Sequence, residues 1–506
     1  MNCRLIWMLA AVMAPGNLPA QTNSAEIPLV QRQWFETRTT HFNVYSCGDP
    51  QKVNLVAARL EEFCEAYALL AGAEAVASPP ILVMAFPDHE TMKPFLPLYH
   101  GQPENIAGLF QRASDENLIV LSLPDDKGTG TDMSVVFHEY THLLLRRNSR
   151  VWPLWLDEGM AELYSTFETT GYEVAIARPI EHHLRLLEQE PLMPLPDLFG
   201  VSHDSPQYNE RERQGIFYAE SWLLTHFLVA GDNEGYKARF KNYTPLLWAG
   251  QTPVQAFTNA LQASLPTVEA ELRDYLARGQ FAPIRFSLPD DVATAKPIAM
   301  WSLTPVENYF RLGDELLEIG RVDDAEKYFK EARKLAPAGP LPYEGLGLVA
   351  VRRGQSDKAL SELTEALQRG SASYRAHYFY AWEKFHQAAA DPAGLTTETA
   401  DEIHAELLKS MMLTPYFGPA HELFGLLGVA RGDDLALAEQ HLQLASELEP
   451  DNPYYLLVLA EAEARNKDVE AARTTLATLL VPSVDTKLRI QAEALLQQIS
   501  GSSPGR

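Results

Sequence analysis

The sequence is short of basic residues, of cysteines and of long apolar runs. Lys and Arg together number 42, against 67 Asp and Glu, which gives a formal net charge of -25. A chain this acidic lacks the basic surface by which proteins bind nucleic acids. No stretch reaches the roughly 18 uninterrupted apolar residues of a membrane-spanning helix. We therefore expect neither a nucleic-acid partner nor a membrane span in the mature chain.

The first residues, MNCRLIWMLAAVMAPGNLPA, have the pattern of a signal peptide. Arg4 provides a short positive region, Leu5–Ala14 forms an apolar run, and Ala20 is a small residue suited to cleavage before Gln21. An N-terminal core helix is the alternative interpretation. We expect residues 1–20 to be removed and the protein to be exported, either to the periplasm or out of the cell.

Export would permit a disulfide, but the two cysteines of the mature chain are badly placed for one. Cys47 ends a predicted strand, HFNVYSC at 41–47, whereas Cys64 lies well along a helix that begins near Gln51. About thirteen helical residues at 1.5 Å each separate them by roughly 20 Å, which is beyond disulfide reach. Unless that helix is broken, we expect two structural thiols and no disulfide.

The first half of the chain alternates between strand and helix patterns. The predicted elements are strands at 41–46, 81–86, 107–112 and 118–123, the last two forming a β-hairpin, and a helix at 53–70. From Met133 to about Phe281 the pattern is mostly helical. Residues 25–285 are thus predicted to form an α+β domain with a mixed sheet and a helical subdomain. The proline-rich, aperiodic segment 286–305 is interpreted as a linker.

The C-terminal part, residues 306–500, repeats with a fixed period. Gly313 and Gly347 are 34 positions apart, and alanines recur at the same step. This period is typical of tetratricopeptide repeats, helix pairs that stack into an all-α solenoid and present a groove to a protein or peptide partner. Ten extra residues are assigned to a helix-poor insertion, DPAGLTTETA at 391–400. An irregular helical bundle is the alternative.

An otherwise apolar helix at 135–147, VVFHEYTHLLLRR, carries His138, Glu139 and His142. Buried polar groups cost free energy unless they are paired. The two histidines are four residues apart on one face, where both imidazoles can bind one zinc ion at about 2.0–2.1 Å. Glu139 is rotated by about 100° and can take a proton from a metal-bound water. The alternative is two buried histidines paired with backbone or carboxylate groups.

A second helix, predicted within 151–167, supplies carboxylates at a suitable spacing. Glu158 and Glu162 are four residues apart on one face, among large apolar residues. One carboxylate beside two histidines completes a site with an open fourth position, which is the arrangement of catalytic zinc. The other carboxylate would accept the ring N–H of a ligating histidine. The two roles could be exchanged, and a solvated helix face is the alternative for the pair.

Together, HEYTH and WLDEGMAE resemble the gluzincin metallopeptidases, specifically the peptidase MA-like group related to the aminopeptidase N family. The resemblance implies that His138, His142 and Glu158 bind Zn²⁺, with Glu162 supporting a ligating histidine. It also implies that Glu139 is the general base. The 15-residue connection between His142 and Glu158 is shorter than in the aminopeptidases.

A further segment, GIFYAESWLLTHFLVAGDNEG at 215–235, is similar to the family helix whose tyrosine stabilises the oxyanion. The similarity implies this catalytic role for Tyr218, and a core aromatic is the alternative. The glutamate that holds the amino group of an aminopeptidase substrate has no counterpart in NIAGLFQR (105–112), which disfavours aminopeptidase activity. This strand could still bind an extended peptide by edge pairing. The histidines given no ligand role are His182, His183, His203 and His226, the last expected to be a packed helix residue.

The sequence thus predicts an exported zinc metallopeptidase with a C-terminal repeat domain for a protein or peptide partner. Two alternatives are a non-catalytic repeat scaffold with a metal-stabilised peptidase-like module, and a zinc hydrolase acting on a non-peptide amide. The same ligands would serve each of them.

Overall fold

The computed structural model describes residues 27–71, 79–104, 106, 108–113, 115–124, 133–146, 152–202, 204–208, 215–289, 299–392, 394–481 and 484–501. The predicted signal peptide at 1–20 and His203 lie outside the described residues. Within these ranges, none of the helices combines the length and the apolarity that crossing a membrane requires.

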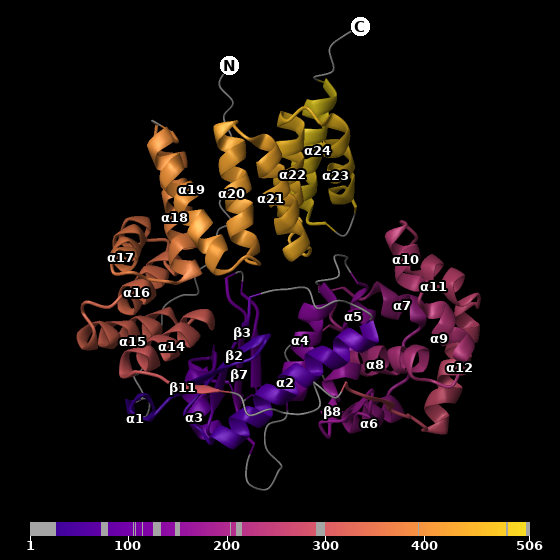
Figure 1. Ribbon diagram of the computed structural model, residues 1–506. Coiled ribbons are helices and arrows are strands. Elements are labelled where there is room, and N and C mark those ends of the chain that lie inside the picture. Colours follow the sequence, from indigo (N-terminus) through magenta and orange to yellow (C-terminus); the bar gives the residue numbers. More distant parts are fainter. Residues whose placement is uncertain are drawn as a thin grey trace.

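A six-stranded mixed sheet lies at the centre of the N-terminal half (Figure 1), in the order β11-β1-β2-β3-β7-β6. Its strands are β1 (Phe35–Arg38), β2 (Phe42–Ser46), β3 (Ile81–Phe86), β6 (Gly108–Gln111), β7 (Leu118–Ser122) and β11 (Met300–Ser302). Strands β2, β3 and β7 run parallel, with Val44 opposite Val83. Strands β6 and β7 pair antiparallel, Leu109 opposite Val120, which confirms the predicted hairpin.

Side chains of β3 and β7 point alternately into two cores. Val83 and Ile119 belong to a core shared with the helices of the N-terminal half. Met84 and Val120 belong to a second core, which continues into the C-terminal helices. Because both faces of these parallel strands are covered, their sequences are almost continuously apolar.

Helices cover one face of this sheet and continue beyond it as a helical subdomain (Figure 1). The helices of the N-terminal half are α1 (Ile27–Val30), α2 (Pro50–Ala71), α3 (His89–Met92), η1 (Lys93–Phe95), α4 (Ser134–Arg146), α5 (Leu154–Ser165), α6 (Glu181–Gln189), α7 (Leu195–Gly200), α8 (Ile216–Val229), α9 (Glu234–Phe240), α10 (Tyr243–Trp248), α11 (Pro253–Leu261) and α12 (Leu265–Arg278). Helix α8 is central, because every residue from Phe217 to Leu228 is buried.

Two small sheets and the segment predicted as a linker complete this half. The small-sheet strands are β4 (Leu98–Tyr99) with β5 (Gln102–Pro103), and β8 (Glu168–Thr169), β9 (Glu173–Ile176) and β10 (Ile284–Ser287). Within 286–305, β10 ends against β9, and β11 extends the large sheet with Trp301 opposite Glu36. The expected linker therefore contains paired strands. Their partners lie far away in the sequence, so periodicity within the segment could not indicate the pairing.

The C-terminal half consists of helix pairs and a final helix, as the 34-residue period predicts. The described helices are α14 (Pro305–Glu318), α15 (Val322–Leu335), α16 (Leu341–Arg352), α17 (Ser356–Gln368), α18 (Tyr374–Ala390), α19 (Thr397–Leu413), α20 (Gly418–Arg431), α21 (Leu435–Leu448), α22 (Tyr454–Arg465), α23 (Val469–Leu479) and α24 (Thr486–Gly501). A Cβ on Gly313 would lie 2.8 Å from Phe329 Cε1, and one on Gly347 2.7 Å from Leu363 Cγ. The recurring glycines are therefore where paired helices touch.

The expected insertion at 391–400 lies between two helices and overlaps the second, since α18 ends at Ala390 and α19 begins at Thr397. Helices α18 and α19 have 17 residues each. Helix α19 begins inside the expected insertion, where the Thr396 side chain accepts a hydrogen bond from the Thr399 backbone N–H. A threonine N-cap satisfies an otherwise unpaired donor of the first turn. Among the described residues of the segment expected to be helix-poor, 397–400 are therefore helical, because this cap starts α19 there.

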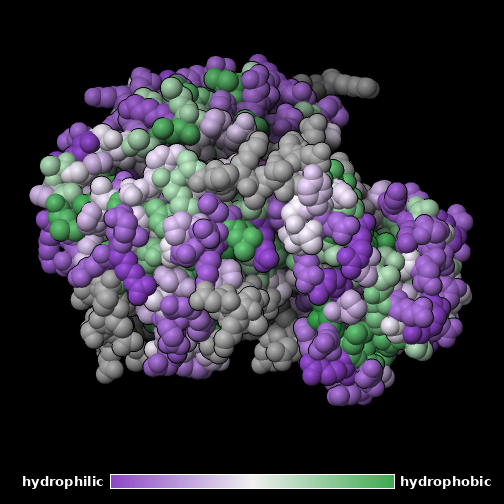
Figure 2. All heavy atoms as spheres, turned by 60° about the horizontal axis from the view of Figure 1, so that its bottom comes forward, coloured by the Kyte–Doolittle hydropathy of each residue, from purple (hydrophilic) through white to green (hydrophobic). Residues whose placement is uncertain are grey.

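Charged and polar side chains cover much of the surface. The face in Figure 2 is mainly hydrophilic, with apolar residues in small groups between the charged ones. The large apolar side chains are concentrated in the two main cores instead, as with the fully buried Trp34, Trp155 and Trp222. This distribution agrees with an acidic chain that keeps its apolar residues for internal packing.

Candidate metal centre

Helices α4 and α5 pack against each other and bring the three predicted zinc ligands together. His138 Nε2 lies 3.1 Å from His142 Nε2. Glu158 Oε2 lies 3.3 Å from His138 Nε2 and 3.5 Å from His142 Nε2. All three residues are buried. The three atoms thus form a nearly equilateral triangle inside the protein.

This triangle has the size that a zinc ion requires. Ligand atoms at 2.0–2.1 Å from a tetrahedral zinc are about 3.3 Å apart. Two imidazole nitrogens and one carboxylate oxygen also make a common donor set for zinc. The residues present therefore fit the ion by both geometry and chemistry, with the fourth position left for water or substrate.

A carboxylate on α5 lies beside the outer nitrogen of each histidine ring. His138 Nδ1 lies 3.5 Å from Glu162 Oε1, and His142 Nδ1 lies 3.1 Å from Asp157 Oδ1. A proton on each Nδ1 leaves the lone pair of each Nε2 pointing into the triangle. Glu162 therefore lies where the sequence analysis expected a supporting carboxylate. Asp157 was missed as a contact, although it precedes Glu158 in the quoted motif.

His183 extends this arrangement from a third helix. It is fully buried on α6, and its Nε2 lies 3.3 Å from Glu162 Oε2. Burial would raise the pKa of the Glu162 carboxyl, but His138 and His183 outweigh burial and lower it. The sequence predicted no role for His183, since no fixed spacing connects α6 with α4.

The charges of the cluster favour a cation at its centre. Burial opposes protonation of His142, but the adjacent carboxylates of Asp157 and Glu158 outweigh burial and raise its pKa to about 10. Burial likewise opposes ionisation of Glu158, yet His138 and His142 hold the pKa of this carboxyl well below its usual range. Both shifts show that the buried carboxylates attract positive charge, and a divalent cation supplies it without protons.

Gly159 sets the distance between α5 and α8. A Cβ at this position would lie 2.1 Å from Thr225 Oγ1 and 2.5 Å from the Ser221 carbonyl oxygen. Only glycine therefore lets the two helices approach this closely. Because Glu158 is the preceding residue, this contact also holds the carboxylate against α4.

Tyr218 is fully buried on α8. A second tyrosine, Tyr208, contacts both Tyr218 and the cluster. The rings of Tyr208 and Tyr218 stack with centroids 5.9 Å apart. Tyr208 OH donates a hydrogen bond to Glu158 Oε1 over 3.3 Å. The phenol in contact with a candidate ligand is thus that of Tyr208. Tyr208 precedes the helix that carries the resemblance, so no motif pointed to it.

A second group with possible metal ligands consists of His41, Glu61 and Cys64. His41 Nδ1 lies 2.6 Å from Glu61 Oε2, and Cys64 Sγ lies 3.2 Å from Tyr140 OH. Ordinary hydrogen bonds therefore account for this group. Cys47 and Cys64 are both thiols, as predicted.

His226 is a packed helix residue, also as predicted. It is fully buried on α8. Its Nε2 lies 3.0 Å from the Ala177 carbonyl oxygen, and Tyr275 OH lies 2.8 Å from its Nδ1. Both ring nitrogens are thus engaged in holding the subdomain together.

The fold combines a mixed sheet, a helical subdomain with a candidate metal centre, and a solenoid of helix pairs. A family model described as "Tetratricopeptide repeat" matches residues 310–373, 344–382 and 425–485. The C-terminal half is therefore built of tetratricopeptide repeats, as its period predicts. A search of curated proteins found no match to the chain.

Several solved structures of repeat proteins are similar to part of the chain. YrrB, described as a TPR protein with an unusual peptide-binding site, is 17% identical over 37% of this chain and 91% of its own, with a TM-score of 0.31. A thermophilic TPR protein of Thermus thermophilus is 24% identical over 38% of this chain and 99% of its own, with a TM-score of 0.29. MamA from Desulfovibrio magneticus is 16% identical over 40% of this chain and 97% of its own, also with a TM-score of 0.29.

Proposed function

We propose that the chain is an exported zinc-dependent metallopeptidase whose repeats bind a protein or peptide. The observation that carries this proposal is the buried triangle of His138, His142 and Glu158, with sides of 3.1, 3.3 and 3.5 Å. A zinc ion bound there would supply Lewis acidity, which polarises a carbonyl and acidifies a coordinated water. A centre in which three side chains leave one position open is typical of catalytic rather than structural zinc.

The remaining chemistry belongs to side chains of the chain itself. Glu139 follows His138 on α4, is half-buried, and would take the proton of the attacking water and pass it to the leaving amine. Tyr218 is the proposed hydrogen-bond donor to the oxyanion, with Tyr208 stacked on it and bonded to Glu158. Asp157 and Glu162 hold the two imidazoles in place.

Replacing the proposed base tests this function directly. Glu139→Gln should keep one zinc per chain, because Glu139 is not a ligand, while kcat on a cleaved peptide falls by roughly 10²–10⁴-fold. His138→Ala should lose the zinc as well as the activity. Metal analysis and a peptide-library cleavage assay give both readouts. Hydrolysis that survives Glu139→Gln would contradict the proposal, as would wild-type protein that binds no zinc after reconstitution.

A second candidate is a repeat scaffold in which the metal centre only stabilises its domain. The observation that favours it is that the family match falls entirely within residues 310–485. Proteins of such repeats use the stacked helices as a binding surface. A stable partner captured by the wild-type chain, with no cleavage of any library peptide and full zinc content, would support the scaffold. Cleavage abolished by Glu139→Gln would exclude it.

We also propose that export involves removal of residues 1–20. The supporting pattern is Arg4 followed by the apolar run Leu5–Ala14 and the small residue Ala20. N-terminal sequencing of the protein from its native host should begin at Gln21. A chain that retains Met1 would contradict this.

A further inference from the structure

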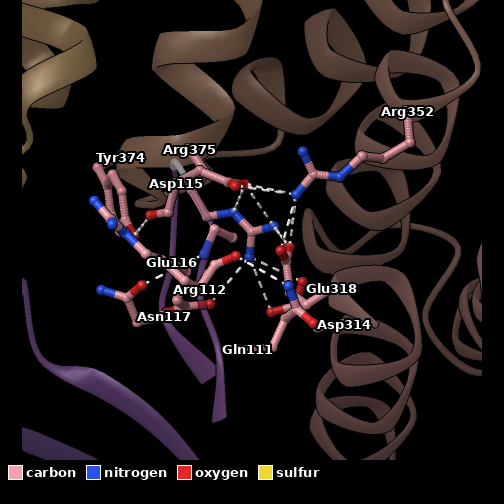
Figure 3. A network of polar contacts seen from close by, with 11 residues as sticks. Gln111, Arg112, Asp115, Glu116, Asn117, Asp314, Glu318, Arg352, Tyr374 and Arg375 are labelled. Atoms are coloured by element: carbon pink, nitrogen blue, oxygen red, sulfur yellow. Dashed lines mark hydrogen bonds and ion pairs between the residues drawn. The ribbon is translucent and has the colours of Figure 1, made fainter. Parts of the chain in front are cut away.

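The turn of the β6–β7 hairpin docks onto the repeats through a buried acidic side chain (Figure 3). Asp115 is only 3% exposed. Its carboxylate accepts hydrogen bonds from Arg352 Nη2 at 3.0 Å and from Arg375 Nε at 3.1 Å. Tyr374 OH donates to the Asp115 carbonyl oxygen over 2.7 Å. The hairpin tip is thus held by α16 and α18.

The same arginines are bound to α14. Arg375 Nη1 lies 2.9 Å from Asp314, and Arg375 Nη2 lies 2.6 Å from Glu318. Arg352 Nη2 lies 2.9 Å from Glu318. These pairs join the first helices of three successive repeat pairs to one hairpin turn. Buried charges of this kind need well-placed partners, so the network specifies one position of the turn.

Strand β6 also packs against α4, the helix that carries His138 and His142. Strand β6 is the last in the order of the six-stranded sheet. A Cβ at Gly108 would be 3.4 Å from Val136 Cγ2, and the rings of Phe110 and Tyr140 are 6.2 Å apart. Val136 and Tyr140 are two positions before and after His138, about 200° around α4 from it, so β6 contacts this helix on the side away from the candidate ligands. An edge strand can hold an extended peptide through its backbone groups, and a peptide paired with β6 would follow the strand that packs on this helix.

We propose that the repeats position β6 for peptide binding, with Arg375 as the positioning residue that acts through Asp115. This inference rests on the proposed peptidase function. The repeats then have a second role besides binding a partner, because they set how well the edge strand is ordered. Loosening the turn weakens peptide binding along β6, while the metal centre stays intact.

Asp115→Asn in the full chain tests this role. The change keeps the side-chain shape, and both arginines retain carboxylate partners on α14, so the repeats stay folded. We expect amide exchange over residues 108–122 to accelerate about tenfold, since the strand opens more often. KM should rise roughly three- to tenfold with kcat within about twofold, because uniform binding is lost. Zinc content should stay at one per chain.

Two further variants keep the test decisive. Asp323→Asn removes a partner of Arg353 inside the repeats and leaves the hairpin untouched, so exchange over 108–122 and KM should not change. Tyr374→Phe removes only the hydrogen bond to the turn and should give a smaller effect of the same kind if Asp115→Asn fails to fold. A KM that rises equally in Asp323→Asn would overturn the proposal.

Arg375 Nη1 also lies 3.1 Å from Glu116 Oε2, a contact that Asp115→Asn leaves in place. Exchange that does not change in Asp115→Asn would therefore overturn the proposal that Arg375 acts through Asp115. Faster exchange with an unchanged KM would overturn the positioning role. If the wild type cleaves nothing, the peptidase proposal fails, and the positioning role fails with it. The exchange measurement then still decides whether the repeats order β6.

Discussion

The histidine rings of the candidate metal centre depend on two carboxylates that are not ligands. Asp157 faces the Nδ1 of His142, and Glu162 faces the Nδ1 of His138. Glu162 also contacts His183, so it is held from both sides. Such outer partners keep the ring orientation and the basicity of a metal-binding histidine.

Glu162→Gln should weaken zinc binding by about 10–100-fold without preventing folding. The amide keeps the size of the side chain, but it removes the charge that favours a proton on His138 Nδ1. Competition with a zinc chelator measures the affinity. The matched control is Glu188→Gln, on the exposed side of α6, which should bind zinc as the wild type does. Equal affinity in both variants would show that Glu162 does not support the centre.

Among the helices, the crossing of α5 and α8 decides whether the ligand Glu158 reaches α4. Gly159 allows this crossing because it leaves room for Thr225 and for the backbone at Ser221. Helix α8 is buried on all sides, so it cannot move outward to make space for a side chain. The glycine in WLDEGMAE therefore has a packing role beside the chemistry of its neighbours.

Gly159→Ala should lower the free energy of unfolding by roughly 1–3 kcal/mol, because the added methyl group forces the two helices apart. Zinc affinity should fall as well, since Glu158 is displaced. Gly200→Ala is the control, because a Cβ there meets no atom within 4 Å. Urea unfolding and zinc titration of both variants check the prediction. A Gly159→Ala protein as stable as Gly200→Ala would refute the close crossing.

Across the whole chain, the sheet joins the two halves into one structure. One face of β3 and β7 contributes Leu82, Met84, Phe86, Leu118 and Val120 to a core that also contains Phe310, Leu346 and Phe379 of the repeats. The repeats are therefore not a separate module on a flexible connection. They cover a sheet face that would otherwise be exposed to water, which is unfavourable for a surface of this size.

A fragment ending at residue 303 should therefore be insoluble or bind hydrophobic dyes when produced alone. Co-production with residues 304–501 should restore a soluble complex of both pieces, because the second core then forms between them. Size-exclusion chromatography and dye binding measure the two outcomes. A monomeric N-terminal fragment that unfolds cooperatively by itself would contradict a shared core.

Features with a fixed spacing along the chain could be predicted from the sequence. The i, i+4 spacing of His138 and His142 places two imidazoles on one helix face, and the structure has them 3.1 Å apart. The 34-residue step between Gly313 and Gly347 reflects one helix pair after another. The first pattern follows from helix geometry over one turn and the second from the length of one helix pair, so the order of residues specifies both directly.

Contacts between distant elements could not be predicted in this way. His183 and Tyr208 reach the metal centre, and β11 reaches the large sheet, only through the packing of whole elements. Asp115 and Arg375 are 260 residues apart in the sequence and in direct contact in the fold. Local spacing identified the repeats and the candidate zinc ligands. Tertiary packing decided which side chains support those ligands and how the repeats hold the hairpin, because such contacts depend on where separate helices and strands meet in space.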